Sequence, residues 1–228
     1  MIRLKDLLTE SSFVFERAYY KDLRTIATAI KQKLLSNQKS LLKNSTSIDF
    51  IDALNSLLNR FGVFVEMEAY EPNLIYPETG IVNGFIDSAA NIYIGLTDDI
   101  IDRVDEDNFD SFANNIHSVI LHELNHVHQF TSAKGRFKPV DSLDSRYLEN
   151  IHEIQSHAIE AMDNYLSLGY NQLQIKKMLK APSLQSTPSP TESDAFWKYY
   201  DYFYEQGNQG STWKGFLKYC VEYLDSID

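Results

Sequence analysis

The chain has 228 residues, of which 43% are hydrophobic and 13% aromatic, and its formal net charge is −11. Such a chain can bury one substantial core, which excludes an intrinsically disordered protein. The acidic balance predicts no nucleic-acid partner, because phosphate binding needs clustered Lys and Arg. No apolar run reaches the roughly 18 to 20 residues that span a bilayer, and no secretory signal is recognisable, so we expect no membrane partner. The single cysteine, Cys220, excludes an internal disulfide and predicts a reducing compartment.

Residues 1–10 form a short amphipathic segment that contains Leu8, Thr9 and Glu10 at its end. The segment resembles the capsid-targeting propeptides of myovirus-type tailed phages, which carry a Leu-x-Glu processing site. This resemblance implies cleavage after Glu10, packaging inside a virion and contact with phage capsid proteins. The residues alone fit a frayed first helical turn equally well, and that alternative stays open.

Helical periodicity follows over residues 17–36 and 48–61, with Ser47 as the expected cap of the second helix. From Gly62 the period changes to two, which is typical of strands. Three short segments show this alternation: 63–70, 80–86 and 91–96. The turn residues between the last two predict a hairpin. The sequence therefore predicts an α+β fold that is mainly helical, with a small, mostly antiparallel sheet.

The next predicted helix runs to about Thr131 and carries the motif His-Glu-Leu-Asn-His over residues 122–126. His122 and His126 stand one turn apart on one side, the spacing with which a helix offers two imidazoles to zinc. Glu123 falls beside the pair, as a base for metal-bound water must. It also lies within an apolar arc, where a carboxylate is costly unless it is paired or close to a metal. The arc consists of Phe112, Ile116, Val119, Ile120, Val127 and Phe130. An amphipathic helix with incidental histidines is the alternative.

The third ligand decides which kind of zinc site the motif forms, because a catalytic site takes three protein ligands and leaves one position open. The metzincin extension needs Gly and His where this chain has Gln129 and Ser132, so that class is excluded. A ligand at Asp141 or Asp144 would resemble the aspzincins, although their Gly-Thr signature is absent. These two aspartates remain the alternative to a glutamate further along the chain.

That glutamate is Glu153, on a second predicted helix that starts near Asp144 or Ser145. A motif helix followed by a helix with a glutamate resembles the gluzincin branch of zinc peptidases, over roughly residues 60–170. The resemblance implies a zincin-like fold with the sheet beside the motif helix, and an extended peptide bound along an edge strand, either 80–86 or 91–96. It also implies one zinc ion held by three ligands, His122, His126 and Glu153, with Glu123 as the general base.

Two further residues are candidates for a catalytic role. In thermolysin-like members the residue four positions after the glutamate is an aspartate that orients a ligand histidine, whereas this chain has His157. A neutral His157 cannot serve as that anionic clamp, but it can hydrogen-bond Glu153 or a ligand, or stabilise an oxyanion. Tyr147 is the second candidate for oxyanion stabilisation, beside Tyr76 and His152, and the sequence does not choose among them.

These patterns predict a zincin-like metallopeptidase domain over residues 13–180, a linker or surface loop over 181–190, and aromatic-rich helices over 191–228 that pack on the core. The expected function is zinc-dependent hydrolysis of a peptide or protein substrate, with Glu123 activating a metal-bound water, in a phage particle or the cytoplasm of an infected host cell. The alternative is a non-catalytic virion internal or structural protein with a degenerate zincin fold. A binding module with structural zinc is disfavoured, because closed zinc sites usually use cysteines.

Overall fold

The structure, a computed structural model, describes residues 16–44, 46–68, 83–132, 149–180, 194–200 and 210–227. Contacts divide the chain into two compact units, the first built mainly from Leu23–His128 and the second from Val14–Asp22 and Gln129–Asp228. Two helices, α2 (Glu16–Ser36) and α6 (Phe109–Ser132), contribute residues to both units. The predicted targeting segment 1–10 and linker 181–190 lie outside the described residues. Among the helices that are described, none is long and apolar enough to cross a bilayer.

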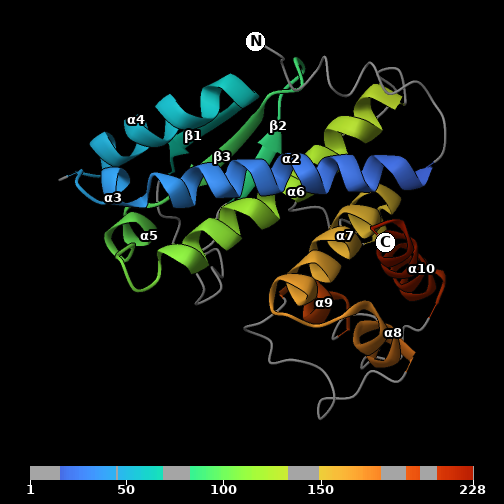
Figure 1. The fold of residues 1–228 in the computed structure, drawn as a ribbon. Coiled ribbons are helices and arrows are strands. Elements are labelled where there is room, and N and C mark those ends of the chain that lie inside the picture. Colours follow the sequence, from blue (N-terminus) through green and yellow to red (C-terminus); the bar gives the residue numbers. More distant parts are fainter. Residues whose placement is uncertain are drawn as a thin grey trace. The chain divides into compact units, whose positions relative to one another are not determined.

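Unit 1 contains a three-stranded sheet formed by β1 (Val63–Met67), β2 (Asn83–Ile86) and β3 (Ile92–Leu96), in the order β1-β3-β2 (Figure 1). The hairpin between β2 and β3 is antiparallel, as the turn residues predicted, whereas β1 runs parallel to β3. The described sheet is therefore mixed, and the prediction of a mostly antiparallel sheet is wrong. Alternation along a strand sets which side chains share a face, but it does not determine which strand takes the centre.

The helices of unit 1 follow the predicted periodicity with small shifts at their ends. Helix α4 (Ser47–Leu58) begins after Thr46, whose Oγ1 accepts the backbone N–H of Asp49 at 3.1 Å. The expected cap at Ser47 is wrong by one residue, because Ser47 is already helical. The other helical segments of this unit are α3 (Gln38–Leu41), a 3-10 turn at Asn59–Phe61 and α5 (Asp98–Asp102).

Apolar residues from both the helices and the strands of unit 1 are buried. On α2 they recur every three or four positions, which is the spacing of one helix face. The fully buried residues include Leu23, Ala27, Ile30 and Leu34 of α2, Val63, Ile92 and Ile94 of the sheet, and Ile116 and Ile120 of α6. This burial positions the sheet and the α6 motif within one core.

The outer edge of β1 is held by a side chain of α4, which lies alongside this strand (Figure 1). The Asn55 Nδ2 donates to the Val65 carbonyl and the Asn55 Oδ1 accepts the Val65 N–H, both at 2.8 Å. The amide thus pairs with both outward-facing backbone groups of Val65, as a neighbouring strand would. An edge that is satisfied in this way is less available for pairing with another chain.

We expect Asn55→Leu to lower the free energy of unfolding by about 1 to 3 kcal/mol, because two part-buried backbone groups lose their partner. Urea unfolding monitored by circular dichroism measures this change. Ser56→Ala, at an exposed position on the same helix, is the control and should change stability by less than about 0.5 kcal/mol. Equal stability of Asn55→Leu and wild type would show that water replaces the amide without cost.

Unit 2 is built around α7 (Ile151–Ser167), which packs on α8 (Gln172–Lys180), α9 (Asp194–Tyr199) and α10 (Ser211–Ser226) (Figure 1). Helix α7 begins later than predicted, since the Asn150 side chain accepts the His152 N–H at 2.9 Å and caps it there. It ends before Gly169, as predicted, where a φ of +89° favours glycine.

The aromatic side chains of α9 and α10 are buried within unit 2. Tyr199 and Phe216 stack with ring centroids 4.5 Å apart, and both are fully buried. The Tyr223 hydroxyl donates to the buried Asp163 carboxylate of α7 at 2.8 Å. Burial also raises the pKa of the Cys220 thiol on α10, so this cysteine is an unreactive core residue.

Candidate functional site

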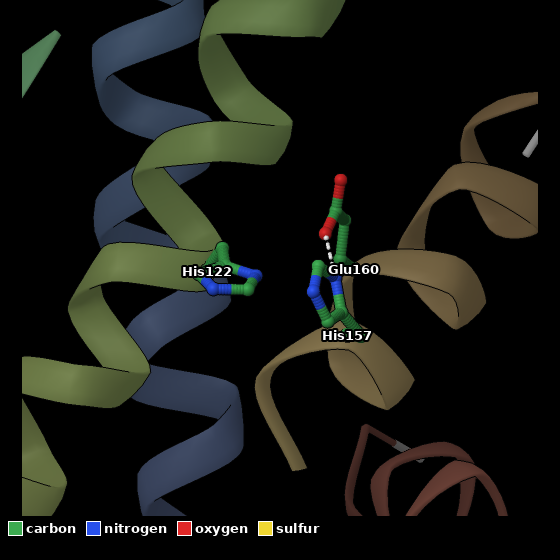
Figure 2. Close-up of side chains that lie close together, drawn as sticks. All are labelled: His122, His157 and Glu160. Atoms are coloured by element: carbon green, nitrogen blue, oxygen red, sulfur yellow. Dashed lines mark hydrogen bonds and ion pairs between the residues drawn. The ribbon is translucent and has the colours of Figure 1, made fainter. Parts of the chain in front are cut away.

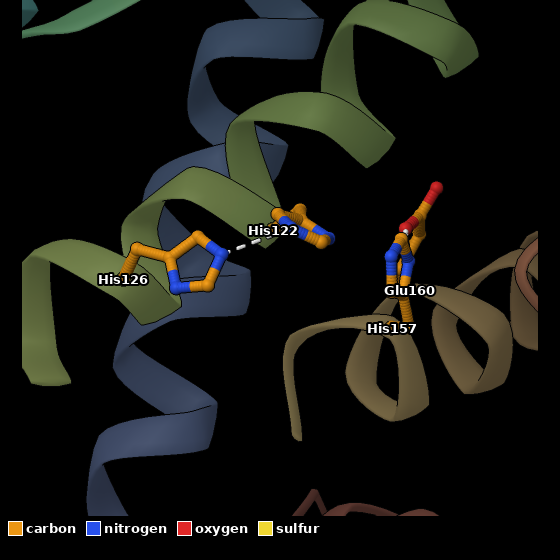
Figure 3. A network of polar contacts seen from close by, with 4 residues as sticks. All are labelled: His122, His126, His157 and Glu160. Atoms are coloured by element: carbon orange, nitrogen blue, oxygen red, sulfur yellow. Dashed lines mark hydrogen bonds and ion pairs between the residues drawn. The ribbon is translucent and has the colours of Figure 1, made fainter. Parts of the chain in front are cut away.

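The two motif histidines converge on the same side of α6. The Nε2 atoms of His122 and His126 lie 3.0 Å apart, and the ring centroids are 4.8 Å apart (Figure 3). Both side chains are buried, with 7% and 6% of their surface exposed. Two imidazoles on one tetrahedral zinc ion, with Zn–N bonds of about 2.0 to 2.1 Å, hold their nitrogens about 3.3 Å apart. The observed spacing of 3.0 Å allows a hydrogen bond between the two rings and lies close to the separation that a shared ion requires.

Glu123 is buried beside this pair, with 6% of its surface exposed, as its place in the apolar arc predicted. Its side chain lies against the backbone of β2 at Gly84. A carboxylate buried among apolar residues is costly unless it is hydrogen-bonded, paired or close to a metal ion.

A second carboxylate is buried in the first turn of α7. Glu153 has 4% of its surface exposed and is the third residue after the Asn150 cap of the helix. A negative charge in a first helical turn interacts favourably with the helix dipole. This stabilisation offsets part of the cost of burying the carboxylate.

One turn further along α7, His157 pairs with a glutamate. The His157 Nδ1 and the Glu160 Oε2 lie 3.0 Å apart, with side chains that are 10% and 19% exposed (Figure 2). A carboxylate at Nδ1 fixes the tautomer and the orientation of an imidazole and makes Nε2 more basic. The anionic partner of His157 is thus Glu160, three residues later, whereas Glu153, four residues earlier, was the predicted partner. The i, i+3 spacing of the two residues was the available signal.

Tyr199 is a functional candidate in the aromatic-rich segment 191–228, which was predicted only to pack on the core. Its ring lies 5.6 Å from the His157 ring, between centroids, and the residue is fully buried. Burial raises the pKa of the Tyr199 hydroxyl, and the negative charges of Glu153 and Glu160 raise it further. The hydroxyl therefore stays protonated at all physiological pH values and can act as a hydrogen-bond donor. No sequence pattern connects Tyr199 with α7, because folding alone brings them together.

Hydrogen bonds within unit 2 link the last turn of α6 to the first turns of α7. The Gln129 Nε2 donates to the His152 carbonyl at 3.2 Å and to the Gln155 Oε1 at 2.9 Å. The Gln155 Nε2 in turn donates to the hydroxyls of Tyr19 and Tyr20 on α2, at 2.9 and 2.8 Å. Gln129, which stands where a metzincin would have glycine, thus connects α6 to α7.

Other predicted site residues are not placed. Tyr147, Tyr76 and the alternative ligands Asp141 and Asp144 lie outside the described residues, so their roles stay predictions. Among the residues that are described, those with donor atoms able to hold a metal ion are His122, His126, Glu153, His157 and Glu160. All of these except Glu160 are buried. Comparison with protein families, curated proteins and solved structures finds no match to this chain.

Proposed function

We propose that this protein is a zinc-dependent peptidase in which His122, His126 and Glu153 hold one zinc ion and Glu123 is the general base. The observation that carries the proposal is the convergence of two buried imidazole nitrogens, 3.0 Å apart, next to a buried glutamate on the same helix. This donor set matches the ligand types and the open fourth position of catalytic zinc sites. The zincin-like fold and the gluzincin resemblance belong to this proposal.

The proposal for Glu153 rests on the contacts of Gln129. His126 and Gln129 are three residues apart on α6 and thus share one face of the helix. Gln129 hydrogen-bonds to α7 at His152 and Gln155, the positions that flank Glu153. The competing donor set is His122, His157 and Glu160. We favour Glu153 because Glu160 already serves His157 as an anionic partner.

When bound, zinc polarises the substrate carbonyl and lowers the pKa of water. Glu123 takes the proton of the attacking water and passes it to the leaving amine, as a general base and then a general acid. His157, oriented by Glu160, and the Tyr199 hydroxyl are the proposed donors to the oxyanion that develops on the carbonyl. A single donor of this kind is worth about 10² to 10³ in rate.

The proposed substrate is a peptide in extended conformation that lies along β2. Two strands, 80–86 and 91–96, were predicted as alternatives for this edge, but β3 is the central strand and has neighbours on both sides. β2 is the edge strand whose Gly84 contacts Glu123, which puts the base next to any chain paired there. Pairing with an edge strand supplies main-chain hydrogen bonds that do not depend on the amino-acid sequence of the substrate, so specificity would come from side-chain contacts. Packaging in a virion, with phage capsid proteins as partners, stays a prediction from residues 1–10.

Metal analysis of the purified protein together with digestion of a peptide library tests this function. We expect about one zinc ion per chain, hydrolysis that stops after chelation and returns with zinc, and a lower melting temperature of the metal-free protein. An ion present at 1,000 times its dissociation constant stabilises the folded state by about 4 kcal/mol. Zinc without turnover would favour the non-catalytic virion protein, and absence of bound zinc with an unchanged melting temperature would contradict the zinc peptidase.

A further inference from the structure

The sheet and the α6 motif approach each other closely at Gly84 of β2. A Cβ atom at this position would lie 2.5 Å from the Val119 Cγ1 and 2.8 Å from both the Cγ and the Oε1 of Glu123. Cβ atoms in real structures essentially never come within 3.0 Å of another heavy atom. The β2 backbone therefore lies against Val119 and Glu123 at a distance that only glycine permits.

Neither neighbour can yield easily. Val119 is β-branched, and such residues have one strongly preferred rotamer in a helix. Glu123 is buried, with only 6% of its surface exposed, so its chain has little room to rotate. A side chain at position 84 would therefore displace β2 from α6 or turn the Glu123 carboxylate away from its present position.

We propose that Gly84 is a positioning residue for Glu123, in that the bare β2 backbone fixes the conformation of this carboxylate. The inference rests on the proposed function for its kinetic consequence, but the contact itself does not depend on catalysis. The β2 backbone limits the conformations of the Glu123 side chain on one side. Contact with Val119 sets the distance between β2 and α6. The strand proposed to bind the substrate thereby sets the position of the general base.

Gly95 of β3 offers a matched control. A Cβ atom there would also meet a glutamate, namely the Cγ, Cδ and Oε1 atoms of Glu68, but no β-branched residue is among its nearest neighbours. Glu68 is half-buried and follows the last residue of β1, so its flexible chain can move aside. Phe85 of β2 pairs with Tyr93 of β3, so these two residues share one face of the sheet. Because faces alternate along a strand, Gly95 lies on that face and Gly84 on the opposite one.

The kinetic test compares Gly84→Ala with Gly95→Ala in the zinc-loaded protein. We expect Gly84→Ala to lower kcat by about 10- to 100-fold, since misplacing a catalytic group by about 1 Å can cost 100-fold. KM should change less than threefold and zinc content should stay at the wild-type level. Gly95→Ala should leave kcat and KM unchanged. In a Glu123→Gln background, Gly84→Ala should cause no further loss, because the group that it misplaces no longer acts.

A second test needs no activity and uses thermal melting of four proteins: wild type, Gly84→Ala, Glu123→Ala and the double variant. We expect Gly84→Ala to lower Tm by about 5 °C in the wild-type background and by clearly less where Glu123 is truncated. The same substitution with Val119→Ala provides a folded alternative if Gly84→Ala alone does not fold. Equal Tm losses in both Glu123 backgrounds, or a further kcat loss in Glu123→Gln, would overturn the inference. Wild type without hydrolysis would refute the proposed function and leave the melting cycle decisive for Gly84.

Discussion

Glu123→Gln is expected to lower the rate of peptide hydrolysis by about 10² to 10⁴-fold, which is the usual contribution of a general base. The amide keeps the shape of the carboxylate but cannot accept a proton from the attacking water. The His122 and His126 imidazoles are untouched, so zinc content should remain at about one ion per chain. Steady-state kinetics on a peptide from the library digest, with metal analysis of the same samples, measures both quantities.

The comparison needs a glutamate that is changed in the same way elsewhere in unit 1. Glu106 is exposed, and its backbone carbonyl rather than its side chain accepts the hydrogen bond from Gln38. Glu106→Gln should therefore keep wild-type kinetics. If Glu123→Gln lost zinc together with activity, the carboxylate would have a role in holding the metal site. An unchanged rate would refute the assignment of the base.

Helical periodicity was sufficient to predict the α6 part of this site. Residues one and four positions apart on a helix have a fixed relation, so His122, Glu123 and His126 could be arranged correctly from sequence alone. The burial of Glu123 followed from its place in the apolar arc. By contrast, the start of α7 was predicted too early, near Asp144 or Ser145, whereas the helix begins at Ile151. The Asn150 side chain caps it there, and no change in the hydrophobic pattern marks this position.

The remaining features depend on contacts between segments that are distant in sequence. The parallel pairing of β1 with β3 was not predictable, since alternation is the same for parallel and antiparallel neighbours on a half-buried face. Tyr199 lies on a helix that follows α7 by more than 25 residues, and only packing brings its ring to His157. Gly84 was part of a predicted strand, but its closeness to Glu123 required the placement of β2 against α6.

Glu153→Ala is expected to weaken zinc binding by more than about 100-fold, because even changes around a ligand cost 10- to 100-fold and this change removes a ligand. Competition with a chromogenic chelator measures the affinity. Loss of a charge in the first turn of α7 also weakens the helix by about 0.3 to 1 kcal/mol, so the fold should survive. Glu153→Gln keeps the size of the side chain and separates loss of the carboxylate from loss of packing.

Glu160→Gln discriminates between the two donor sets on α7. If Glu153 is the ligand, removing the charge of Glu160 only loosens His157, so zinc affinity should fall less than about tenfold while kcat decreases through the weakened oxyanion donor. If instead His157 and Glu160 hold the ion with His122, the order of the two zinc affinities is reversed. Glu160→Gln then loses zinc while Glu153→Ala retains it. Retention of zinc in both variants would move the third ligand to Asp141 or Asp144. The order of the two affinities therefore decides which turn of α7 belongs to the metal centre.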